Sequence, residues 1–163
     1  MNTLAHRHGG GVILFTLLAA FVLAIVPLPE AARIYRPDWV LLVLLYWALA
    51  LPHRVGVGVA WLAGLVQDVL TGTLLGQHAL AYAVTIYLII KLHQRIRLYP
   101  LWQQSLSLLV LLALAQLIVL WINGIVGRPV HSWLYWMPSL LGALVWPPLF
   151  LLLRNLRRAF RVS

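Results

Sequence analysis

Residues 105–122, SLSLLVLLALAQLIVLWI, form an apolar run whose one strongly polar side chain is Gln116. At about 1.5 Å of rise per residue, a helix of this length reaches nearly across the roughly 30 Å hydrocarbon core of a bilayer. Five further apolar runs occupy residues 12–26, 39–51, 55–70, 74–90 and 133–153. We therefore expect an all-α membrane protein in which residues 1–163 form one integral membrane domain, a bundle of six transmembrane helices.

Composition supports a membrane location. Hydrophobic residues make up 63% of the 163 positions, and only three residues are acidic. Twelve Lys and Arg residues give a net charge of +9, but they lie between and after the apolar runs and not on a polar domain. We therefore expect these cations to set the membrane topology, and we expect no nucleic-acid partner.

The distribution of basic residues predicts the orientation. With six spans and the N-terminus inside, nine cations fall on the cytoplasmic side and only Arg33, Arg36 and Arg128 fall outside. Positive charge concentrates on the cytoplasmic side of membrane proteins, so we expect both termini to be cytoplasmic. The first run lacks a convincing small-x-small cleavage site, and we expect it to be a retained helix and not a signal peptide.

Two of the runs, 39–51 and 55–70, are short for a full crossing. A re-entrant hairpin would bring Arg54 near the membrane midplane, at a cost of about 2.5 to 3.5 kcal/mol. We expect two short spans joined at the surface, with local thinning of the bilayer or snorkelling of side chains.

A small or acidic residue recurs at every fourth position across the third run and the turn after it. Small residues at this spacing allow two helix backbones to approach closely, within one chain or between chains. We expect close helix contact at Gly64 and Gly72. The complete series is Gly56, Ala60, Gly64, Asp68, Gly72 and Gly76.

Asp68 is the only carboxylate inside a predicted span. An intramembrane carboxylate is a candidate functional residue. Three roles are open: it pins the turn at residues 71–73, it forms a proton or substrate site, or it contacts a partner. Donors within reach include the backbone of that turn, His78 and arginines of other loops. We expect no second titratable group to accompany it within the spans.

The segment Arg36-Pro37-Asp38 opens the second predicted helix. Pro37 restricts the backbone before the helix, and Asp38 is suited to cap its N-terminus, where the helix dipole favours an anion. A cation gains nothing from that dipole, so we expect Arg36 to pair with Asp68 or Glu30.

The chain contains no cysteine, and its six histidines are scattered without metal-ligand spacing. We expect no metal, no cofactor and no disulfide. An intramembrane enzyme would need convergent catalytic groups, which the sequence does not provide. We therefore expect a protein that is not an enzyme.

Two segments closely resemble the MreD family of bacterial rod shape-determining membrane proteins: RPDWVLLVLLYWALALPHRVGVG at 36–58 and GLVQDVLTGTLLGQHAL at 64–80. LWQQSL at 101–106 and VWPPLFLLLRNLRR at 145–158 extend the likeness to about four-fifths of the chain. Asp68, Gly72 and Gly76 match the family motif. Asp38 matches a position that is Asp or Asn in the family.

The resemblance implies a non-enzymatic scaffold of the cell-elongation complex in the bacterial inner membrane. The implied partners are MreC and, through the complex, MreB filaments, RodA and a class B penicillin-binding protein, together with membrane lipids. The family is also distantly similar in fold to the substrate-binding subunits of energy-coupling-factor transporters. The alternative function is accordingly a substrate-binding membrane subunit of a small-molecule transporter. Candidate structural or partner-interface residues are Arg36, Pro37, Asp38, Gly64, Asp68, Gly72 and Gly76.

Overall fold

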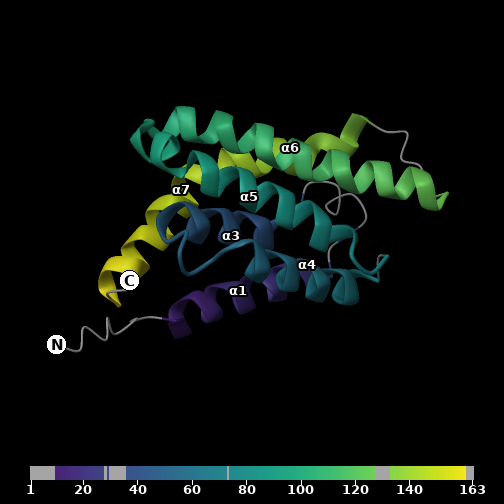
Figure 1. Ribbon diagram of the computed structural model, residues 1–163, viewed down its shortest axis with the longest axis horizontal. Helices are drawn as coiled ribbons and strands as arrows, with labels where there is room; N and C mark the ends of the chain where they lie inside the picture. The colour runs from purple at the N-terminus through teal and green to yellow at the C-terminus, as the bar shows by residue number, and fades with distance from the viewer. Residues whose placement is uncertain (1–9, 28, 30–35, 73, 128–132, 161–163) are drawn as a thin grey trace.

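A computed structural model describes residues 10–27, 29, 36–72, 74–127 and 133–160. These residues form six α-helices and one short 3-10 helix, arranged as a bundle (Figure 1). The elements are α1 (Gly10–Ile25), α3 (Trp39–Ala50), α4 (Val57–Thr71), α5 (Gln77–Leu98), α6 (Leu101–Val126), η1 (Trp133–Trp136) and α7 (Met137–Ala159). The expectation of an all-helical bundle built from six apolar segments is confirmed.

The helices run alternately up and down, so that α1 begins and α7 ends at the same end of the bundle (Figure 1). We call this the basic end, because every described Lys or Arg except Arg36 lies toward it. The opposite end, where α3, α5 and α7 begin, carries Asp38 and Asp68, and we call it the acidic end. The residues of the basic end are Arg54, Lys91, Arg95, Arg97, Arg154, Arg157 and Arg158.

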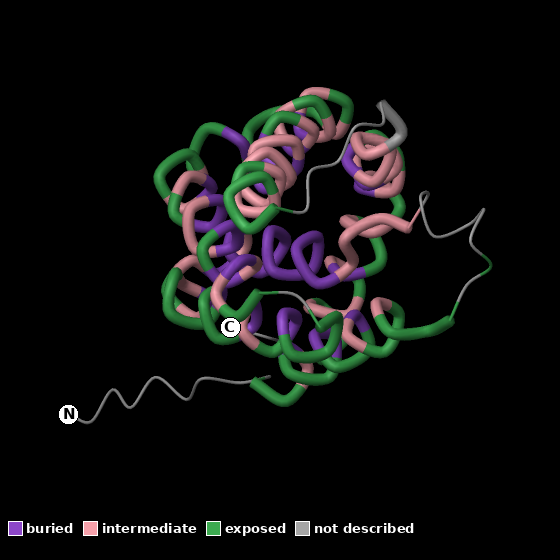
Figure 2. The backbone as a smooth tube through the Cα atoms, turned by 90° about the vertical axis from the view of Figure 1, so that its right-hand side faces the viewer, coloured by how far each residue is buried: buried purple, intermediate pink, exposed green. Residues whose placement is uncertain are grey.

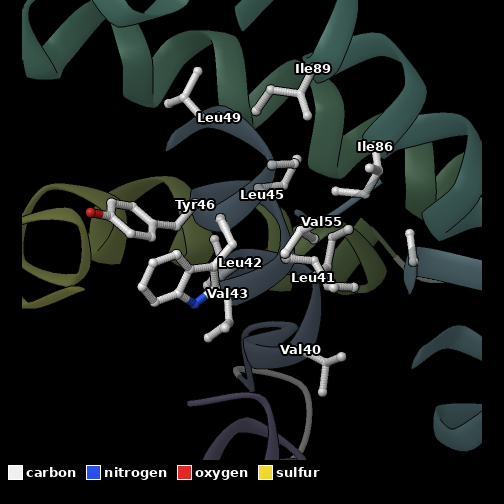
Figure 3. Close-up of a cluster of buried hydrophobic side chains, with 14 of the residues drawn as sticks. Val40, Leu41, Leu42, Val43, Leu45, Tyr46, Leu49, Val55, Ile86 and Ile89 are labelled. Carbon is white, nitrogen blue, oxygen red and sulfur yellow. The ribbon is translucent and has the colours of Figure 1, made fainter. Parts of the chain in front are cut away.

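Helix α3 forms the centre of the bundle. Its sequence WVLLVLLYWALA is apolar all round, and every residue from Val40 to Leu49 is buried. A helix without a polar face is kept from water by protein neighbours or by lipid, and here protein neighbours cover it. Helices α1, α5 and α7 pack against it, which places the buried segment in the middle of Figure 2. Figure 3 shows its side chains meeting Ile86 and Ile89 of α5.

Several polar side chains inside the bundle are paired between helices. The indole Nε1 of Trp47 in α3 donates to Thr16 Oγ1 in α1 at 2.9 Å. The indole of Trp146 in α7 donates to Gln104 Oε1 at 3.2 Å, and the Gln104 amide donates to the Ile96 carbonyl at 3.0 Å. A buried polar group without a partner is costly, so these bonds fix how the helices pair.

Large apolar side chains cover much of the outer surface. Phe15 of α1, Val69 of α4 and Leu144 of α7 are each about 70% exposed. Such a surface would promote aggregation in water but is stable in contact with lipid. Two helices, α6 and α7, are long and apolar enough to cross a bilayer, whereas α1, α3 and α4 are shorter apolar helices. The described residues therefore have the character of a membrane protein.

Helix α5 departs most from its predicted boundaries. It begins at Gln77 and continues to Leu98, not from 74 to 90, and α6 begins at Leu101. The predicted loop between these helices is therefore reduced to Tyr99 and Pro100. Charged residues end an apolar run but remain good helix formers, so the helix continues until proline disfavours helical backbone in the residue before it.

Candidate functional site

A cavity of about 290 Å³ lies at the acidic end, between the start of α3 and the facing sides of α4, α5, α6 and α7. Its apolar wall includes Leu41, Leu112 and Val119. Its volume is near the lower limit for sites that bind small molecules. The polar groups that line it are Arg36, Asp38, Gln67, Thr71, His78, Tyr82, Gln116, Tyr135 and Ser139.

Asp38 caps α3 and joins it to α5. Its Oδ1 accepts from the Leu41 backbone N–H at 3.2 Å, which confirms the predicted N-cap. The Tyr82 hydroxyl donates to the same carboxylate at 2.7 Å. Burial raises the pKa of Asp38, and nearby His78 and the hydrogen bonds from Tyr82 and Leu41 offset this only in part. The carboxylate thus fixes the wall of the cavity between two helices.

Arg36 is bound differently from our expectation. Its guanidinium donates to the carbonyls of Ala24 and Val26, where α1 ends. Carbonyl groups at a helix C-terminus have no partner within the helix and carry the negative end of its dipole, so they attract a cation. The predicted pairing with Asp68 is therefore wrong, and Glu30 lies outside the described residues. The Arg36 Nε is buried and finds no hydrogen-bond acceptor among the described residues.

Asp68 is fully buried and joins the end of α4 to the start of α5. Its carboxylate accepts from the backbone N–H groups of Gly76 at 2.9 Å and His78 at 3.0 Å. The Nδ1 atom of His78 lies 2.7 Å from Asp68 Oδ1, and a proton on Nδ1 makes this a charge-assisted hydrogen bond. The expectation that no titratable group accompanies Asp68 is wrong. The contact itself is confirmed, because His78 was among the donors expected within reach of Asp68.

The four-residue series of small residues serves two different purposes. A Cβ atom on Gly64 would lie 2.4 Å from the Cα and 2.5 Å from the backbone N of Ala79, so the close contact between α4 and α5 is confirmed. The predicted contact at Gly72 is wrong, because nothing lies within 4 Å of its Cβ position. Gly72 and Gly76 have φ of 69° and 100°, and they end α4 and precede α5. Only glycine adopts such backbone angles readily.

Gln116 and Gln67 face the cavity from α6 and α4. The Gln116 amide donates to the Tyr135 carbonyl at 2.8 Å, and the Tyr135 hydroxyl donates to the Gln116 carbonyl at 2.7 Å. Ser139 donates to the Gln116 side-chain oxygen. The Gln67 Oε1, in contrast, is buried with no donor among the described residues. Among the described residues, Gln67 Oε1 and Arg36 Nε are thus a buried acceptor and a buried donor without partners, and both belong to residues that line the cavity.

Sequence reasoning did not single out Tyr82, Tyr135 and Ser139. A signal for α5 exists, because His78, Tyr82 and Thr85 recur at the spacing of one helical face. No comparable pattern marks Tyr135 and Ser139, which reach the site through the turn before α7. Within the described residues, no group of three or more His, Asp or Glu side chains is placed to hold a metal ion.

Known proteins with similar sequences identify the family of this chain. No solved structure matches the chain. The rod shape-determining protein MreD of Haemophilus influenzae is 34% identical over 152 residues, which cover 91% of this chain and 94% of that protein. The family model described as rod shape-determining protein MreD matches residues 6–156. The chain therefore belongs to the MreD family of rod shape-determining proteins.

Proposed function

We propose that this MreD family member is a non-enzymatic scaffold that binds MreC in the membrane. Together with MreC it would couple cytoplasmic MreB filaments to the glycosyltransferase RodA and its class B penicillin-binding protein. Family membership supports the role in rod shape. The cavity at the acidic end is the observation that supports a binding role, and we assign the binding surface to it.

The chemistry of the cavity fits a docked polypeptide segment. Arg36, Pro37 and Asp38, three of the candidate partner-interface residues, line it together with Gln67. The free Gln67 Oε1 would accept from a backbone N–H, and the Arg36 Nε would donate to a carbonyl. Backbone groups of a partner supply both kinds of atom side by side. Docking would thus remove the desolvation cost of the two unpaired atoms.

We further propose a multi-pass inner-membrane protein with both termini in the cytoplasm. The gathering of cations at the basic end supports this orientation, because positive charge concentrates on the cytoplasmic side. The acidic end and its cavity would then face outward, toward an extracytoplasmic part of MreC. A distant relationship of the fold to energy-coupling-factor subunits is part of the same proposal.

Filling the cavity tests the binding role. Ala115 of α6 lines the cavity, whereas Ala113 of the same helix does not. Ala115→Leu should abolish capture of MreC from membranes while the protein stays at normal abundance. Ala113→Leu introduces the same side chain two residues away and should capture MreC normally. Undiminished capture by a stable Ala115→Leu protein would contradict docking in the cavity.

The polar lining of the cavity also favours a second candidate, a substrate-binding subunit of a small-molecule transporter. Its polar wall, with Gln67, His78 and Tyr82 among others, is richer than the sequence indicated. Affinity capture distinguishes the two functions. Recovery of transporter ATPase subunits in place of MreC would support the transporter and reject the scaffold.

A further inference from the structure

The basic end has a charge imbalance that the described part of the chain does not neutralise. Asp38 and Asp68 lie at the opposite end, and the third acidic residue, Glu30, is outside the described residues. No described Asp or Glu therefore lies near the cations of the basic end. The positive-inside tendency accounts for their side of the membrane but not for how they are grouped.

Three of these cations gather at the end of α7. Arg154, Arg157 and Arg158 stand at i, i+3 and i+4, so they share one face of the last turns. All three lie close enough to the hydroxyl of Tyr46 in α3 to act on it electrostatically. We call these three residues the arginine cluster.

An aromatic platform supports the arginine cluster. The Arg154 guanidinium lies 6.0 Å from the centroid of the Phe150 ring, within cation–π range. Phe150 in turn contacts the Tyr46 ring edge-on, with centroids 5.6 Å apart. The platform holds Arg154 against the aromatic rings, on the helix face that it shares with Arg157 and Arg158. Like charges held in this way repel one another unless an anion lies between them.

The arginine cluster differs from the nearby Arg97 in its hydrogen bonds. Arg97 donates to the carbonyls of Leu49 at 2.7 Å and Ala50 at 2.8 Å, so its guanidinium is occupied in closing the end of α3. The Nε of Arg154, in contrast, is buried without an acceptor among the described residues. The described residues thus satisfy the hydrogen-bonding capacity of Arg154 only in part.

We propose that the arginine cluster binds the phosphate of an anionic phospholipid in the leaflet at the basic end. Guanidinium groups bind phosphate oxygens through paired, charge-assisted hydrogen bonds. Leu151 and Leu152, three and two residues before Arg154, are exposed and continue the apolar surface along which acyl chains would lie. Clusters of basic residues beside the end of a transmembrane helix attract such headgroups. Free phosphate has no acyl chain and would gain nothing from this apolar surface.

Thermal unfolding in neutral detergent micelles tests the proposal. Addition of phosphatidylglycerol should raise the melting temperature of the unmodified protein, whereas phosphatidylcholine and inorganic phosphate should not. The Arg154→Gln/Arg157→Gln protein should need about tenfold more phosphatidylglycerol for the same shift, because two phosphate contacts are lost. Lys91→Gln/Arg95→Gln removes equal charge from the same end and should respond normally.

Each other result overturns the proposal. Equal loss in both double variants would indicate unspecific attraction to the charged end, and an equal shift with inorganic phosphate would indicate a free-anion site. Should the arginine double variant fail to fold, Arg158→Gln replaces it, because that side chain is exposed. Native mass spectrometry should then show fewer phosphatidylglycerol adducts on Arg158→Gln than on Arg95→Gln. Equal numbers would refute the site.

Discussion

Substitution of Gly64 by alanine probes the closest contact between two helices of the bundle. The added Cβ would lie 2.4 Å from the Ala79 Cα, whereas ordinary van der Waals contacts begin at 3.4 Å. The deficit is about 1 Å, and the opposing atoms belong to the backbone of α5, so no side-chain rotation relieves it. Helices α4 and α5 would have to separate, which also disturbs the bonds of Asp68 to Gly76 and His78.

Overpacking of this kind typically destabilises by about 1 to 3 kcal/mol, and the backbone contact places Gly64→Ala toward the upper part of that range. Gly58 is the matched control. It lies in the same helix, is exposed and has nothing within 4 Å of its Cβ position. Gly58→Ala should stabilise by at most about 0.5 to 1 kcal/mol, because Gly58 lies in the first turn of α4 and helix propensity acts fully only in the helix interior. The two identical changes should therefore shift stability in opposite directions.

The assay is thermal or denaturant unfolding of the purified variants in one detergent, with abundance in membranes measured alongside. Gly64→Ala should unfold at a lower temperature than the unmodified protein, and Gly58→Ala at an equal or higher one. Equal stability of the two variants would refute the close packing of α4 against Ala79.

Three further predictions concern polar groups and orientation. Asp68→Asn should keep most rod-shape function, because the His78 imidazole can change tautomer and accept from the new amide. Asp68→Leu leaves buried donors unpaired and should abolish function. A normally abundant but inactive Asp68→Asn protein would show that the charge is required. Tyr82→Phe removes a donor to the carboxylate that caps α3 and should cost about 1.5 to 3 kcal/mol in unfolding experiments, while Tyr87→Phe, at a half-exposed ring, should be neutral. Single cysteines that replace Arg33 and Gln94 in this cysteine-free chain should be labelled from outside only at position 33. Labelling at position 94 from outside would show that the orientation is the opposite one.

Local patterns in the sequence predicted much of the fold. Apolar runs separated by charge and proline indicated all six helices, and the residue types at 36–38 indicated the cap of α3. The extent of α5 was underestimated, because an apolar run marks the part of a helix that meets lipid and not the helix itself. Residues such as Lys91 and Arg95 end the run while the backbone remains helical.

The site was predicted only in part, because its contacts join residues far apart in sequence. Asp38 and Tyr82 are 44 positions apart, and no local pattern connects them. The glycine series shows a different limit. Gly64 and Gly72 share one spacing, yet one is needed for its lack of a side chain and the other for its positive φ. Spacing alone does not distinguish these two uses of glycine.

Site-specific photocrosslinking from α6 tests the central claim most directly. Val119 lines the cavity at the acidic end, whereas Val110 of the same helix is 67% exposed on the outer surface. A photoreactive amino acid at position 119 should crosslink to MreC in intact cells, and the same residue at position 110 should not. Crosslinking to MreC from position 110 and none from position 119 would show that MreC binds the outer face of the bundle and would contradict docking in the cavity.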